Sequence, residues 1–192
     1  MTPRGAREHG FTMVELMVVV TILGIVAAVA VGSYKRNPTG DDARRLAAVM
    51  SVAYRTAVAG GPIRADVATA NNIRARAQLL FKKTDDSWTA TVFRVVEDDL
   101  PATGLSLVPV QTMVLDSEVT LHNIVDGAQI GLASSAIDEF DDPDDEVTKN
   151  YFPDGTAQAY TLYLKHRLRD NATRFRVVSL PLSPGAQVFR DW

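Results

Sequence analysis

The residue with the clearest chemical potential in this sequence is Glu15, a carboxylate near the start of an otherwise apolar run. Residues 11–31 read FTMVELMVVVTILGIVAAVAV and contain no other charged side chain. A carboxylate at membrane depth costs about 2.5–3.5 kcal/mol on insertion scales, so it is expected to have a function. Two interpretations stay open: the side chain reaches the lipid headgroups, or it pairs with a cation from outside the run.

A suitable cation would appear if the chain were cut between Gly10 and Phe11. The new α-amino group would stand four residues before Glu15. It could neutralise Glu15 of its own chain or that of a neighbouring copy. In the second case Glu15 would set the register between identical helices, as single buried polar residues do in helical bundles. We therefore expect Phe11 and Glu15 to act in assembly.

Few other residues could carry chemistry. His9, His122 and His166 are scattered, and no metalloprotease, serine-hydrolase or P-loop pattern occurs. The chain has no cysteine, which excludes disulfides and thiolate metal sites. The acidic loop 138–146 has oxygen ligands but no EF-hand glycine, so we interpret it as a solvated loop, with calcium as the alternative. We expect no enzyme activity, no cofactor and no resident metal.

The apolar run is long enough to cross a membrane. Its 21 residues would form a helix of about 31 Å, close to the roughly 30 Å hydrocarbon core of a bilayer. A removable signal peptide has a shorter apolar region, and residues 29–32 supply only a poor cleavage site. Basic residues flank the run on both sides, so their charge does not settle its orientation. A retained membrane helix is expected.

The order of residues at the N-terminus resembles the class III signal of type IV pilins and type II secretion pseudopilins. The pattern is a short basic leader ending in Gly10, then Phe11, then Glu15 fifth from the cut, then sixteen apolar or small residues. The resemblance implies that a prepilin peptidase cleaves after Gly10, that Phe11 is N-methylated, and that Glu15 pairs with the amine of an adjacent subunit. His9 and Gly32 depart from the family, which often has a basic residue and a proline there.

The resemblance also implies partners and a location. The expected partners are other pilin or pseudopilin subunits, the prepilin peptidase, the inner-membrane assembly platform and membrane lipid, whereas nucleic acid is not expected. The chain would span the bacterial inner membrane once, with its head in the periplasm, and then enter a periplasmic or extracellular filament. The alternatives are a membrane-anchored periplasmic binding domain that does not polymerise and a DNA-binding minor pilin for DNA uptake. The sequence does not separate a pilus from a secretion pseudopilus.

The pattern of elements predicts an α+β fold, with a leader at residues 1–10, a long helix at 11–59 and a β-rich head at 60–192. Thr39 or Asp41 is expected to cap the helix where it restarts after Pro38. The second half of the helix has an apolar face at helical spacing, which needs a sheet to cover. This face consists of Leu46, Val49, Met50, Ala53 and Ala57.

The head is predicted to be an antiparallel sheet. Hairpins are expected from residues 73–83 with 88–96 and from 159–169 with 173–182, and single strands at 119–125 and 187–189. The segments YFPDGTAQAYTLYL and RFRVVSLPLSPGAQV resemble the C-terminal strands of the GspH/FimT group of minor pilins and pseudopilins. That resemblance implies a tip or priming subunit of low abundance.

Four arginines of the second hairpin form a possible anion or partner patch: Arg167, Arg169, Arg174 and Arg176. A turn at residues 170–173 would place Arg169 opposite Arg174 and Arg167 opposite Arg176, all on one face. Leu168 and Phe175 would then face the core. Like charges directly opposite each other are destabilising, so the patch should attract anions. The anions are expected to come from the acidic loop 138–146 of the same or an adjacent subunit. The alternatives are that water alone solvates the patch or that nucleic-acid phosphate binds it.

Overall fold

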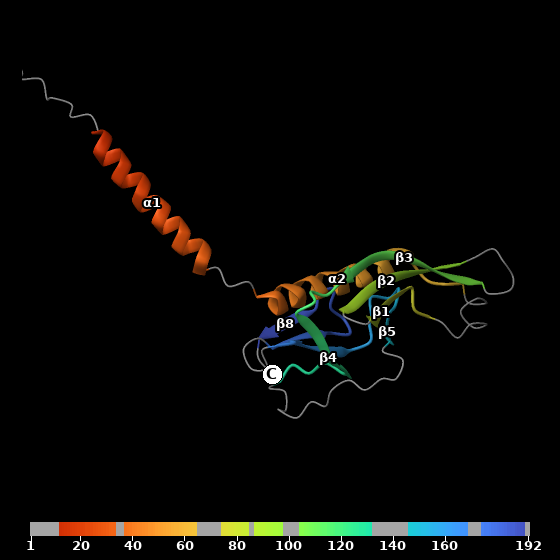
Figure 1. Cartoon of the computed structure of the whole chain (residues 1–192). Helices are drawn as coiled ribbons and strands as arrows, with labels where there is room; N and C mark the ends of the chain where they lie inside the picture. The colour runs from red at the N-terminus through yellow and green to blue at the C-terminus, as the bar shows by residue number, and fades with distance from the viewer. Residues whose placement is uncertain are drawn as a thin grey trace, which may run out of the picture. The chain divides into compact units, whose positions relative to one another are not determined.

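The computed structural model describes residues 12–33, 37–64, 74–84, 87–97, 104–131, 146–168 and 174–190 (Figure 1). The chain divides into two compact units, an N-terminal unit, Met1–Arg36, and a head, Asn37–Trp192. The expected leader, residues 1–10, lies outside the described residues.

In the N-terminal unit, the described residues 12–33 contain one helix, α1 (Met13–Ser33). Its large apolar side chains are 44–81% exposed, and they occur on every side of the helix. A helix that is apolar all round is found in a membrane or inside a larger assembly. Within the described residues, α1 is the one helix long and apolar enough to cross a bilayer, over Met13–Ala30.

The head begins with a second helix, α2 (Pro38–Gly60), which has a cap of its own. Asn37 is the N-cap, and its side chain accepts a hydrogen bond of 3.1 Å from the backbone N–H of Gly40. The prediction of a cap at Thr39 or Asp41 is therefore wrong, because α2 begins earlier, at Pro38. Proline suits the first helical position and disfavours helical geometry in the residue before it.

The predicted C-terminus and apolar face of α2 are confirmed. The helix ends at Gly60, and Gly61 follows with a φ of +63°, a conformation that glycine adopts without strain. The five apolar residues predicted to share a face, Leu46, Val49, Met50, Ala53 and Ala57, are all buried. The amphipathic pattern thus correctly identifies the side of α2 that packs on the sheets.

After α2, the strands that the structure describes in the head form two antiparallel four-stranded sheets (Figure 1). The first has the order β3-β2-β1-β5, from β1 (Ala77–Thr84), β2 (Ser87–Glu97), β3 (Leu105–Val114) and β5 (Glu146–Tyr151). The second has the order β4-β6-β7-β8, from β4 (Val119–Asp126), β6 (Tyr160–His166), β7 (Phe175–Ser179) and β8 (Gln187–Arg190). Helix α2 packs against strands of both sheets, so the predicted α+β class is confirmed.

The hydrophobic core lies where α2 meets the two sheets. Its largest fully buried members are Leu46, Val49, Leu79, Phe81, Val92, Val119, Tyr160, Leu162, Leu164 and Val177. The hydroxyls of Tyr151 and Tyr160 share a buried hydrogen bond of 2.7 Å, which satisfies both polar groups. No residue of α1 belongs to this cluster. The head therefore contains its own core.

The strand predictions are confirmed in part. The first hairpin pairs as expected, with Thr84 opposite Ser87, and the predicted strands at 119–125 and 187–189 are β4 and β8. Strands β3 and β5 were not predicted. Pro109 interrupts the strand pattern of β3, but β3 is an edge strand, where proline is tolerated.

Candidate functional site

The N-terminus of α1 is closed by a reciprocal pair of side chains, Thr12 and Glu15. One carboxylate oxygen, Oε2 of Glu15, accepts hydrogen bonds from the backbone N–H of Thr12 at 2.8 Å and from its hydroxyl at 2.9 Å. The backbone N–H of Glu15 donates to the Thr12 hydroxyl at 3.2 Å. This is a capping box, in which the two residues satisfy backbone donors that the helix leaves open.

The capping box gives Glu15 a local role that the sequence analysis missed. The signal was present, because a threonine followed three residues later by a glutamate before an apolar run is the signature of such a cap. In lipid the role matters more, since no water is available for unpaired backbone groups. Both bonds fall on Oε2, and Oε1 has no bond to the residues that the structure describes. That oxygen can therefore accept a cation. Gly10 and Phe11 lie outside the described residues.

This N-terminal segment matches a known family model, the "Prokaryotic N-terminal methylation motif", over residues 5–31. The chain carries a type IV pilin signal. The matched region includes the predicted processing residues Gly10 and Phe11, the capping pair Thr12–Glu15, and most of α1. The matched region therefore includes the whole apolar run, residues 11–31, which the sequence predicts to be a membrane helix.

No curated protein matches the chain. Among solved structures, the minor pseudopilin EpsH from the type 2 secretion system of Vibrio cholerae is similar to it, with 11% sequence identity and a TM-score of 0.47. The alignment covers 80% of this chain and 98% of that chain. A similarity of this degree assigns no function.

The predicted pairing of Arg167 with Arg176 is wrong. In the β6–β7 pair, Tyr163 stands opposite Arg176 and Leu164 opposite Phe175, so Arg167 and Arg176 are not partners. Strand β6 ends at His166 and β7 begins at Phe175, which makes the connection longer than the predicted turn. Phe175 is buried in the core as predicted, but Leu168 is 85% exposed. Arg169 lies outside the described residues.

Arg176 instead has a structural role on the second face of its sheet. Its side chain is buried and donates to the backbone carbonyl of Ile130 at 3.1 Å and to that of Gly131. Its guanidinium carbon lies 4.7 Å from the centre of the Phe189 ring. Hydrogen bonds and a ring face compensate the loss of hydration that burial of this charge entails. Arg176 thereby holds the segment after β4 against the sheet.

The acidic loop and the histidines offer no metal site within the described part of the head. Residues 138–145 lie outside it, and Glu146 pairs with Lys82 at 3.3 Å. His166 is buried, with its Nε2 3.6 Å from a carboxylate oxygen of Glu118 and its Nδ1 accepting the N–H of Leu168. The calcium hypothesis therefore stays a prediction.

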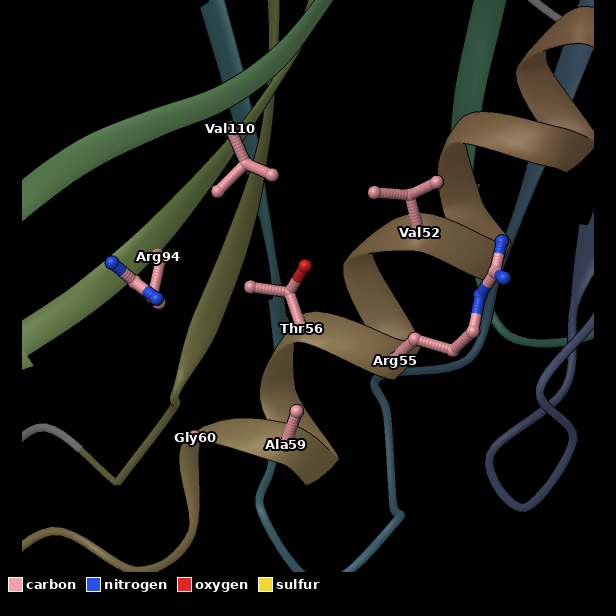
Figure 2. Close-up of a pocket in the computed structure, with 7 residues that line it drawn as sticks. All are labelled: Val52, Arg55, Thr56, Ala59, Gly60, Arg94 and Val110. Atoms are coloured by element: carbon pink, nitrogen blue, oxygen red, sulfur yellow. The ribbon is translucent and has the colours of Figure 1, made fainter.

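A groove on the head was not anticipated. It lies between α2 and the strands β2 and β3 and has a volume of about 450 Å³ (Figure 2). Its lining consists of Val52, Arg55, Thr56, Ala59, Gly60, Arg94 and Val110. The groove combines aliphatic walls with the guanidinium group of Arg94, whereas the side chain of Arg55 extends away from the strands (Figure 2). Such a lining suits an occupant that is both apolar and anionic.

Proposed function

We propose that this protein is a structural subunit of a type IV filament system, either a type IV pilus or a type II secretion pseudopilus. It is inserted in the inner membrane with its head in the periplasm, cleaved after Gly10 by a prepilin peptidase, and N-methylated on Phe11. The observation that carries the proposal is α1, which bears the methylation motif and exposes apolar side chains on all sides. Such a helix needs lipid or other helices around it.

Assembly then uses two interactions of α1. Apolar helices from several subunits pack together, while Glu15 pairs with the N-terminal amine of an adjacent subunit. The capping box supports this second step, because Thr12 holds Oε2 of the carboxylate and leaves Oε1 for the amine. Pairing offsets a cost of about 2.5–3.5 kcal/mol for a lone carboxylate in the bilayer. A subunit that is out of register leaves this cost uncompensated.

Mass spectrometry of the protein isolated from its native membrane tests the proposal. The expected N-terminus is N-methyl-phenylalanine derived from Phe11. Gly10→Val should block cleavage, whereas Gly5→Val, a matched change elsewhere in the leader, should leave it intact. An unprocessed Met1, or a cut near Gly32, would show that the chain is instead a membrane-anchored binding domain or a signal-peptide substrate.

Within a filament system, we assign the chain to the minor subunits that prime assembly or occupy the tip. The support is the resemblance of its C-terminal strands to the GspH/FimT group. Its abundance in sheared filaments, measured against the major subunit, should therefore be low. A chain that forms the bulk of the filament would contradict this assignment. The DNA-binding alternative depended on the arginine patch, and the predicted Arg167–Arg176 pair of that patch is not formed.

A further inference from the structure

Strand β3 presents an unusual amount of apolar surface for the edge of a sheet. Leu107, Val108, Val110 and Val114 are each 40–53% exposed. Long apolar edge strands invite pairing with another chain unless something protects them. This edge therefore either binds a partner or is blocked against one.

The backbone of β3 is poorly suited to accept an added strand. Its register with β2 shifts between Val92 and Phe93, and the shift leaves Val110 without an opposite residue. The N–H of Leu115 donates to Trp88, so the pair Gln111–Val92, four residues back, is also of the hydrogen-bonded type. After the one-residue shift the next pair, Pro109–Phe93, is of the other type, so the nitrogen of Pro109 faces the open edge, where it has no hydrogen to donate. A bulge and a proline are devices that protect edges. A partner must therefore use the side chains rather than the backbone.

The groove offers those side chains. Val110, the residue that the register skips, lines it from β3, and Val52, Thr56 and Ala59 line it from α2 (Figure 2). Bulges often re-aim a side chain in this way. The result is an open, aliphatic trough of about 450 Å³, which has room for one large apolar side chain and its neighbours.

The charges of the groove indicate what fills it. Arg94 continues the row of Trp88, Ala90 and Val92, whose side chains face the core, yet it is exposed and forms no ion pair or hydrogen bond with any residue that the structure describes. Arg55, also exposed, donates to the carbonyl oxygen of Ser51 at 3.3 Å. An exposed arginine beside apolar walls, Arg94, complements an anionic segment that also has an apolar side chain.

We propose that this groove binds the acidic segment 138–146 of a second copy of the chain. Seven of its nine residues, DEFDDPDDE, are acidic, and its one aromatic residue is Phe140. Carboxylates of the segment pair with Arg94, and the Phe140 ring lies against Val110 and Val52. A symmetric contact between two grooves would bring arginines together and is disfavoured. The inference names a partner surface for the proposed filament subunit, but it does not depend on processing of the N-terminus.

Fluorescence anisotropy with a labelled peptide of residues 135–146 tests the contact, using the full chain in non-ionic detergent. We expect saturable binding that weakens with salt. Arg94→Glu and Val110→Ser should each weaken it at least tenfold. The matched controls, Arg44→Glu on the exposed side of α2 and Val114→Ser at the far end of β3, should bind as the wild type does. A peptide with Phe140→Ser should also bind more weakly, and lysines in place of its acidic residues should restore binding to Arg94→Glu.

Three results would overturn the proposal. One is the absence of peptide binding to the folded wild-type chain, with folding checked by circular dichroism. Another is an equal loss with Arg44→Glu, which would mean unspecific attraction. The third is much tighter binding to a chain that lacks residues 138–145, because the groove would then hold the segment of its own chain. None of these results alters the N-terminal mass that tests the proposed function.

Discussion

The capping box at the start of α1 predicts that Thr12 prepares Glu15 for assembly. Thr12→Val keeps the size of the side chain and the bond from the backbone N–H to Oε2, but it removes both bonds of the hydroxyl. Loss of an N-cap side chain costs about 0.5–2 kcal/mol. Since 1.4 kcal/mol is a factor of ten in an equilibrium, incorporation should fall by roughly 2- to 30-fold. Thr12→Ser keeps the hydroxyl and should behave as the wild type.

The assay is the amount of subunit in sheared filaments relative to the amount in the membrane, with the processed N-terminus measured in each variant. Glu15→Ala should be processed normally and incorporated least, because it loses the cap and the proposed amine partner together. In the double variant Thr12→Val/Glu15→Ala, the threonine change should add less than it costs alone, since Glu15→Ala has already removed the bond of the hydroxyl to the carboxylate and leaves only its bond from the backbone N–H of residue 15. Additive losses, or equal defects from Thr12→Ser and Thr12→Val, would refute this reasoning.

Three further predictions concern the stability of the head and the local unfolding of α1. Burial raises the pKa of the Asp42 carboxyl, although it accepts the N–H of Asp116 at 2.6 Å. The folded state therefore holds this proton to a higher pH than the unfolded state, whose value is near 3.8. In urea titrations, the free energy of unfolding should thus fall as pH rises above about 3.8, and Asp42→Asn should lack this part of the fall. A contribution of Asp42 that instead increases stability with pH would contradict the prediction. Arg176→Met should lower the free energy of unfolding by about 1.5–3 kcal/mol, because it removes charged bonds to two carbonyls, whereas Arg94→Met, at an exposed position of β2, should change it by less than about 0.5 kcal/mol. Residues 24–32, which begin and end with glycine, should be the segment of α1 that loses its helical structure most readily outside lipid. Unbroken helical density there in a filament map would disprove this prediction.

Local sequence was sufficient for the two helices and the nature of the N-terminus. The length and uniform apolarity of residues 11–31 predict a helix that needs lipid or other helices, and α1 is such a helix. The apolar spacing of Leu46, Met50 and Ala53 identifies the buried face of α2, because helical periodicity alone places them on one side. The motif around Glu15 can be recognised from the sequence for the same reason, since the residues that form it lie within a few positions of one another.

The register of the second hairpin and the role of Arg176 were decided only by the tertiary structure. Alternation of side chains shows which residues share a face, but it does not show how long the connection is or what covers the other face. Strand β7 is buried on both sides, so its pattern did not mark Arg176 as an inward residue. The carbonyls of Ile130 and Gly131 that hold Arg176 are more than forty residues away in the chain. The groove likewise exists only because α2 and the bulged edge of β3 meet in space, and no local signal could have shown that Val52 and Val110 line the same groove.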